Sequence, residues 1–326
     1  MKGNTLWILA LLVTLLSCEK KESPLPPASG QFIEAGIGAA YDRQLYFNVL
    51  TGEFVKEDSR DSHDLLIEGS PDGRYIHLAS ANFQFVKNKG TVAFSSVTDT
   101  VGGPWLYDYP TGEGHRTAFG RWFNEDGSSK GEVFILDLGL DAQGNPLGYK
   151  KIQFLSVDDS EYRIRYANLD NTGDTTLSVS KDPDHFLIGF SFHTNTVVDA
   201  QPLSGDWHLL FTQYTDYDLT TEGDTQAYLV RGVLLNPTQT EAIMLQDQNW
   251  NALDRDAAIG KTFSDDWNEI GYRWKYYDFD QAAYVVRENY QYLIRLKSGN
   301  WYKMRFVGFY NDQGEKGYPR FEIIGL

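Results

Sequence analysis

The fifteen residues from Tyr292 to Phe306 decide the fold: Tyr292-Leu293-Ile294-Arg295-Leu296-Lys297-Ser298-Gly299-Asn300-Trp301-Tyr302-Lys303-Met304-Arg305-Phe306. Two apolar runs flank a glycine-containing turn at 297–300. In the second run the apolar residues Tyr302, Met304 and Phe306 alternate with Trp301, Lys303 and Arg305. A period of two on either side of such a turn predicts an antiparallel β-hairpin with one buried face.

The rest of the chain repeats this type of pattern. Short apolar runs bounded by turn residues lie at 44–50 with 53–55, at 133–139 with 149–154, and at 186–192 with 196–198. The chain has 326 residues with 20 Tyr, 19 Phe, 8 Trp and 30 Gly, a composition typical of strands and tight turns. The sequence therefore predicts an all-β protein with little helix, the one short helix falling at Ala252 to Ala258.

The order of these runs occurs twice. The strand–turn–strand segment at 44–55 matches the one at 186–198, 61–67 matches 205–212, and Gly120-Arg121-Trp122 matches 271–274. This self-similarity predicts an old internal duplication, with one β-rich half at 31–182 and a second at 183–326. The alternative is a single sandwich whose strands merely look alike.

The first thirty residues read as a targeting segment. A basic start and the apolar run Leu6 to Leu16 are typical of a signal peptide at 1–17, too short to span a bilayer comfortably. Cys18, the only cysteine, follows in a pattern that resembles the lipobox of bacterial lipoproteins. We expect lipidation of Cys18, a proline-rich flexible tether at 18–30, and a lipid-anchored protein on the outer membrane or cell surface. The alternative is an ordinary signal peptide with a free cysteine.

Charge and motifs exclude several classes of function. Lys and Arg number 29 against 45 Asp and Glu, a net charge of −16, so the chain lacks the basic footprint that nucleic-acid binding needs. It has no Gly-x-Ser-x-Gly motif, and with Cys18 lipidated it has no cysteine nucleophile. Acid pairs at 265–266 and 278–280 are typical of solvated turns, and 168–174 reads as a hairpin turn rather than a calcium loop because position twelve is Val179. We therefore expect no catalytic residues, no metal besides a haem iron, and no enzyme.

A family resemblance follows from motifs that lie in a fixed order. These are Phe190-Ser191-Phe192 before Val197-Val198, the segment 205–215 beginning Gly205-Asp206-Trp207, 228–237, 270–275 and the closing 306–319. Their order resembles the HmuY family of haem-binding surface lipoproteins of Gram-negative bacteria, best over 183–326 and more loosely over 31–182. The resemblance implies a two-part all-β protein that binds haem or a related porphyrin and passes it to a TonB-dependent outer-membrane receptor for iron acquisition.

The resemblance also implies where iron ligands belong. In the family these are histidines between the Asp-Trp motif and the final hairpin, but here residues 212–290 contain no histidine. The candidate within that interval is Met244, since methionine can ligate haem iron, although methionine is also common as core filler. His193, at a predicted turn, and His208, beside Trp207, are the candidate haem-binding residues outside it.

Two other classes of function stay open at this point. Exposed Trp and Tyr platforms would suit a glycan-binding surface lipoprotein of a polysaccharide-uptake system. A carboxylate pair would suit a surface hydrolase.

Overall fold

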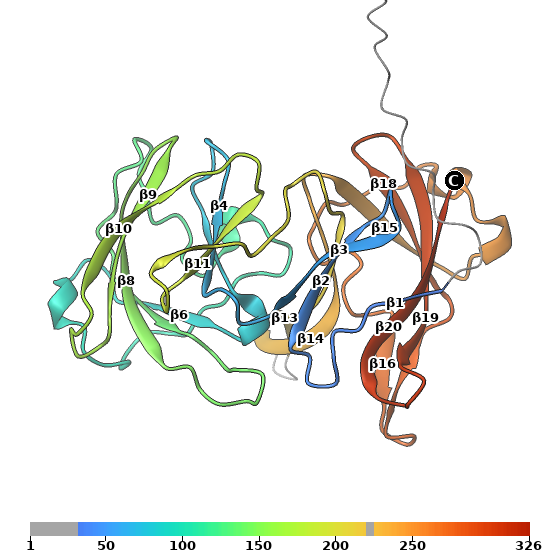
Figure 1. Ribbon diagram of the computed structural model, residues 1–326, viewed down its shortest axis with the longest axis horizontal. Coiled ribbons are helices and arrows are strands. Elements are labelled where there is room, and N and C mark those ends of the chain that lie inside the picture. Colours follow the sequence, from blue (N-terminus) through green and yellow to red (C-terminus); the bar gives the residue numbers. More distant parts are fainter. Residues whose placement is uncertain (1–31, 220–224) are drawn as a thin grey trace, which may run out of the picture.

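The computed structural model describes residues 32–219 and 225–326, and within them the chain forms strands and short 3₁₀ turns with no α-helix. The strands build two β-sandwiches that lie side by side along the long axis (Figure 1). The predicted all-β fold is confirmed. No helix in these ranges is long and apolar enough to cross a membrane. The predicted signal peptide, Cys18 and the tether lie outside the described residues.

The first sandwich, at the left of Figure 1, packs a five-stranded sheet against a four-stranded sheet. The five-stranded sheet has the order β10-β9-β8-β7-β6, and the four-stranded sheet β12-β11-β4-β5. Side chains from facing strands fill the core between them, among them Ile67, Phe154 and Phe190, all fully buried. The strands are β4 (Leu65–Glu68), β5 (Ile76–Leu78), β6 (Phe85–Asn88), β7 (Phe134–Asp137), β8 (Tyr149–Val157), β9 (Glu161–Ala167), β10 (Thr175–Ser180), β11 (Leu187–Ser191) and β12 (Thr196–Val198).

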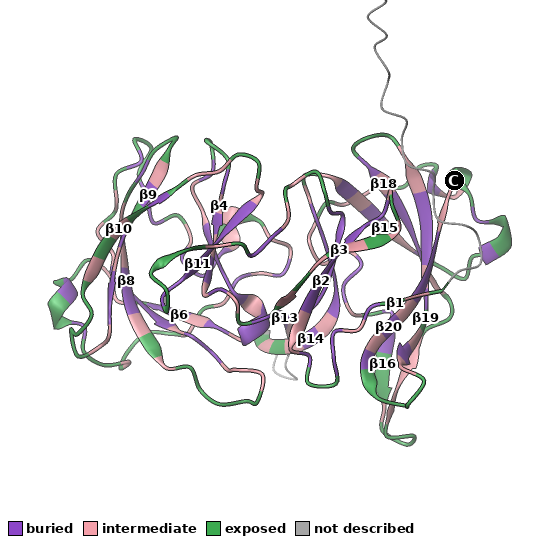
Figure 2. Ribbon diagram, viewed as in Figure 1, coloured by how far each residue is buried: buried purple, intermediate pink, exposed green. Residues whose placement is uncertain are grey.

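The second sandwich, at the right, is built in the same way from sheets of order β1-β20-β19-β18-β15 and β14-β13-β2-β3. Phe47, Phe211 and Met304 meet in its core, and Figure 2 shows the buried stretches along the facing strands. Its strands are β1 (Ile33–Glu34), β2 (Arg43–Asn48), β3 (Glu53–Ser59), β13 (Leu209–Leu219), β14 (Thr225–Leu235), β15 (Thr240–Gln246), β18 (Tyr290–Leu296), β19 (Trp301–Tyr310) and β20 (Lys316–Gly325). A separate two-stranded hairpin joins β16 (Lys275–Asp278) to β17 (Ala283–Val286).

The two four-stranded sheets exchange hairpins. β2, early in the chain, pairs with β13, where Leu45 lies opposite Phe211. Reciprocally, β11 pairs with β4, where Phe190 lies opposite Leu65. The strand pairs therefore cross the expected boundary between 182 and 183, and each sandwich takes one hairpin from the other half. The duplication itself stays a prediction about the origin of the chain.

Further contacts join the two sandwiches between the exchanged hairpins. Gln213 Nε2 of β13 donates a hydrogen bond to the Ala81 carbonyl at 2.7 Å, and Thr215 Oγ1 donates to the Ser80 carbonyl at 2.8 Å. Both carbonyls belong to the 3₁₀ turn η1 (Ser80–Asn82). These bonds, one buried and one part-buried, hold β13 against the first sandwich.

Two details differ from expectation. In place of one helix at 252–258 there are two 3₁₀ turns, η4 (Trp250–Ala252) and η5 (Arg255–Ala258), because Asn249 and Asp254 each accept a backbone hydrogen bond at the turn start. Lys303, expected on the solvent face, is buried: its ammonium donates to the Trp250 and Leu253 carbonyls at 2.8 and 3.1 Å. The remaining 3₁₀ turns are η2 (Phe94–Ser96) and η3 (Gly114–Arg116).

Candidate functional site: a tyrosine-lined cleft

A cleft rich in tyrosine lies between β14 and the β16–β17 hairpin, which projects from the lower edge of the second sandwich (Figure 1). This tyrosine cleft has a volume of about 90 Å³. Beside the same hairpin lies another hollow, the outer depression, of about 450 Å³. Tyr277 and Tyr284 line both. The other cleft residues are Tyr228, Leu229, Val230, Arg231, Tyr272, Lys275 and Tyr276; the depression adds Ala39, Ala282, Tyr310, Gly314, Glu315 and Lys316.

The hairpin sequence explains how the aromatic rings are presented. Tyr277 of β16 lies directly opposite Tyr284 of β17, with ring centroids 5.2 Å apart. The turn between them is closed by Asp278, whose carboxylate accepts hydrogen bonds from the backbone of Asp280 and Gln281 at 2.9 and 3.0 Å. Phe279 at the tip is 88% exposed. Its ring lies 5.2 Å from that of Tyr277 by centroids and adds to the exposed aromatic surface of the hairpin.

Three cations surround the tyrosines. Lys275 is buried, and its ammonium donates to the Arg231 carbonyl and lies 4.3 Å from the centre of the Trp274 ring. Burial, together with the charge of Arg231, holds the pKa of Lys275 well below its usual range. The guanidinium of Arg231 lies 4.2 Å from the ring centre of Tyr41, and that of Arg287 lies 4.7 Å from the ring centre of Tyr276.

None of these three cations forms an ion pair with a carboxylate among residues 32–219 and 225–326. Carboxylates are abundant in this acidic chain, so the lack of a partner is notable. Lys275 is buried, Arg231 is half-buried and Arg287 is exposed, so the cost of an unpaired charge falls mainly on Lys275 and would be reduced when an anion arrives. The cleft is therefore suited to a flat ligand that carries acidic groups.

The three residues expected from the sequence lie elsewhere. Met244 is half-buried on β15, opposite Tyr292, and packs against the main core of the second sandwich. His193 is exposed in the turn between β11 and β12 of the first sandwich. No hydrogen bond joins these residues to each other or to His208, and iron ligation by any of them stays a prediction.

The surroundings of His208 are those of a buried residue of the fold. It is buried just before β13, and its Nδ1 accepts a hydrogen bond from the Val49 backbone N–H at 3.2 Å. Burial lowers its pKa to about 4, and burial lowers the pKa of His63 equally, to about 4. Both imidazoles are therefore neutral in the folded protein near pH 7.

These two histidines predict a loss of stability in mild acid. Below pH 6.5 the unfolded chain protonates them while the folded protein does not, so the free energy of unfolding falls as the pH drops from 6.5 towards 4. We expect a loss of about 2 kcal/mol per histidine between pH 7.5 and pH 5. The raised pKa of buried Asp108 opposes this loss at the acidic end.

Urea unfolding of wild type and His208→Asn at both pH values tests this expectation. Asparagine keeps a hydrogen-bond acceptor for Val49 but cannot be protonated, so the variant should lose about 2 kcal/mol less than wild type. An identical pH dependence in both proteins would contradict the assignment.

The tyrosine cleft lies inside the interval 212–290, the one in which the family resemblance places iron ligands. The sequence-based prediction named Met244 in that interval and none of its tyrosines. The consecutive pair Tyr276-Tyr277 next to Lys275 was the available signal, because tyrosine also ligates haem iron. The contribution of Tyr228 and Arg231 from β14 depends on long-range packing and carries no such signal.

Comparison with known proteins gives the family. The family model described as HmuY protein matches residues 40–323, so the chain belongs to the HmuY family. No curated protein matches it. Similar solved structures include the apo HmuY analogue TFO of Tannerella forsythia, 11% identical, covering 91% of this chain and 97% of that one, with a TM-score of 0.33. Apo PinO of Porphyromonas gingivitis is 9% identical over 91% of this chain and 96% of that one, with a TM-score of 0.29. A Bacteroides vulgatus structure described as a candidate HmuY-like haem-binding protein is 17% identical over 41% of this chain and 81% of that one, with a TM-score of 0.19.

Proposed function

We propose that this chain is a lipid-anchored surface protein that binds haem or a related porphyrin at the tyrosine cleft. Membership of the HmuY family supports the ligand class. The location is supported by cations without carboxylate partners that lie beside tyrosines packed edge to face, with the Tyr277 and Tyr284 planes 75° apart. A porphyrin is flat and apolar on its faces and carries two propionates, so it matches both features.

The residues present fit such a ligand in three respects. Arg231 supplies positive charge for the propionates, and Lys275 adds to it once a bound propionate raises its lowered pKa. The rings of Tyr228, Tyr276 and Tyr277 supply faces for the macrocycle. A phenol oxygen can ligate ferric iron, and Tyr277 lines both hollows. The cleft itself is too small to enclose a porphyrin, so the ligand would lie across the hairpin and extend into the outer depression, whose volume is within the range of ligand sites.

In this role the protein collects haem and passes it on. A half-open site on a projecting hairpin leaves one side of the ligand accessible, which suits transfer to a TonB-dependent receptor. Lipidation at Cys18 followed by the tether would hold the folded part near such a receptor at the outer membrane. No catalytic step is assigned to the chain.

Glycan binding is the second candidate, and the exposed rings favour it. Phe279 and Tyr228, 54% exposed, could stack on sugar faces in the same region. The unpaired cations favour an acidic ligand over a neutral glycan, which is why the porphyrin is preferred. A glycan array run alongside the haemin titration separates the two.

The proposal is tested by titrating the mature chain, residues 18–326 in detergent, with haemin. We expect saturable binding with the spectrum of tyrosine-ligated ferric haem, lost or strongly altered in the double variant Tyr276→Phe/Tyr277→Phe. Tyr149→Phe is the matched control, because Tyr149 is equally exposed but lies on β8 of the first sandwich. Met244→Ala, His193→Ala and His208→Asn test the sequence-based candidates. An unchanged spectrum in the double variant would overturn the assignment to the cleft.

A further inference from the structure

The edge strands of the four larger sheets differ in how they are protected from pairing with another chain. An edge strand exposes unpaired backbone N–H and C=O groups, and proteins protect such edges by shortness, by charged side chains or by a covering segment. β1, β5 and β12 have only two or three residues each. β3 carries charged side chains along its length: Glu53, Lys56, Glu57 and Asp58. Backbone bridges cover β6, β14 and β15, and they are made by Leu106, Gly271 and Ser264.

The remaining edge strand, β10, has none of these protections. Its sequence is Thr175-Thr176-Leu177-Ser178-Val179-Ser180, with no charged residue and no proline, and it pairs with β9 in unbroken register without a bulge. Among the described residues no backbone hydrogen bond reaches β10 from a segment other than β9. The strand lies near the left end of Figure 1, on the outside of the first sandwich. Its outer edge is therefore open to a further strand.

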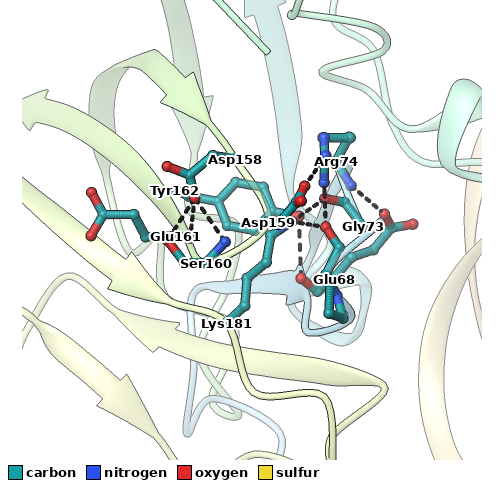
Figure 3. A network of polar contacts seen from close by, with 10 residues as sticks. Glu68, Gly73, Arg74, Asp158, Asp159, Ser160, Glu161, Tyr162 and Lys181 are labelled. Carbon is teal, nitrogen blue, oxygen red and sulfur yellow. Dashed lines mark hydrogen bonds and ion pairs between the residues drawn. The ribbon is translucent and has the colours of Figure 1, made fainter. Parts of the chain in front are cut away.

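β10 is fixed at both ends, so a partner strand would meet a preformed edge. Before the strand, Asp174 forms an ion pair with Arg165 of β9 at 2.6 Å. After it, the backbone N–H of Lys181 donates to the Ser160 carbonyl at 2.7 Å. The Lys181 ammonium donates to the Gly73 carbonyl at 2.6 Å, within the network of Figure 3. A preorganised edge loses little conformational entropy when another strand adds to it.

The side chains of β10 alternate between the two faces of the sheet. Thr176, Ser178 and Ser180 are exposed, whereas Val179 is buried and the half-buried Leu177 packs against the core of the first sandwich. Residues directly opposite each other share a face, so a second β10 must match exposed residues with exposed ones. Two registers do this and pair nearly the whole strand, one centred on Leu177 and one on Ser178. Both place only uncharged β10 residues opposite each other, and Leu177 then meets Leu177 or Val179 of the second copy.

We propose that β10 is a dimerisation edge, to which β10 of a second copy adds as an antiparallel strand. The two five-stranded sheets would then form one continuous sheet. A second copy fits because the strand is complementary to itself: no like charges meet, and Leu177 gains an apolar neighbour. Each copy offers one such edge, so two-fold pairing closes at a dimer and does not continue into a filament. The inference uses no residue of the tyrosine cleft and is independent of the ligand proposed there.

The small contact area predicts a weak dimer. A strand of six residues covers much less than the roughly 1,200 Å² of total surface that stable interfaces bury. We therefore expect association that depends on protein concentration. Copies anchored through Cys18 in one membrane would have a higher effective concentration, which favours the dimer.

Sedimentation equilibrium of the mature chain, residues 18–326 in detergent, tests the dimer. The protein mass should rise from one copy towards two as the concentration increases. Thr176→Lys/Ser178→Lys should weaken association at least tenfold, because each register then places lysine opposite lysine. Both positions are exposed, so the fold should be unchanged by circular dichroism. Thr194→Lys/Thr196→Lys is the matched control, because these threonines are also exposed but lie at β12. All variants keep the anchor, so association through detergent alone would persist in each.

Disulfide cross-linking identifies the paired strands, since Cys18 is the only native cysteine. Ser178→Cys should give a covalent dimer by itself if the register is centred on Ser178. If it is centred on Leu177, a mixture of Thr176→Cys and Ser178→Cys proteins should cross-link instead. Thr196→Cys should stay uncross-linked. A single copy at every concentration, or a dimer that keeps its affinity in the lysine variant of β10, would overturn the inference; a single copy would leave the edge to an extended segment of a different protein.

Discussion

Replacing Trp274 by alanine is expected to lower the free energy of unfolding by about 3–5 kcal/mol. Trp274 is fully buried, and its ring stacks on Phe306 with centroids 3.8 Å apart and planes 8° apart. Its indole N–H donates to the Gly271 carbonyl at 3.1 Å, a bond that alanine cannot make. The loss comes mainly from the large cavity, because the Gly271 carbonyl also accepts the Val233 backbone N–H at 3.0 Å and stays bonded.

Urea unfolding of the variant beside Phe279→Ala measures this effect. Phe279 is a large aromatic of the same hairpin region but is exposed, so its removal should change stability by less than about 0.5 kcal/mol. Because the chain has two sandwiches, tryptophan fluorescence and circular dichroism should both be followed, since their transitions need not coincide. A loss below 1 kcal/mol for Trp274→Ala would mean that the second sandwich is not packed as described.

Replacing Lys275 by methionine is expected to stabilise the fold and, at the same time, to weaken haemin binding. The side chains have similar volume, so the change removes a buried amine without opening a cavity. The desolvation cost that lowers the Lys275 pKa disappears, together with the effect of Arg231, and we expect the free energy of unfolding to rise by about 1–2 kcal/mol. The same change should weaken haemin binding tenfold or more, which corresponds to about 1.4 kcal/mol.

A substitution that raises stability but weakens binding indicates that the replaced residue serves binding rather than folding. A bound propionate would also raise the pKa of Lys275, so binding to wild type should tighten as the pH falls, and binding to the variant should show less of this effect. Lys297→Met is the matched control, because Lys297 is a surface lysine paired with Glu241 at 2.9 Å. Equal haemin affinity in wild type and Lys275→Met would remove Lys275 from the site.

Local pattern predicted the hairpins well. The paired strands β2–β3, β7–β8, β11–β12 and β18–β19 all form where period two and turn residues placed them. The exchange of hairpins was not predictable, because β2 and β13 are about 160 residues apart and nothing in either strand specifies its distant neighbour. Lys303 shows the same limit: its burial depends on carbonyls that η4 and the residue after it supply from elsewhere in the chain.

The candidate sites divide in a similar way. The family resemblance indicated the correct family, and its interval for iron ligands contains the tyrosine cleft. The cleft needs β14 beside the β16–β17 hairpin, which only the fold provides.

The location of iron in the haemin complex tests the central claim most directly. Anomalous scattering at the iron edge, measured on crystals of the mature chain grown with haemin, gives the iron position without a model of the porphyrin. The account predicts a peak at the tyrosine cleft next to Tyr277. No peak there, with iron bound only elsewhere or not at all, would contradict it.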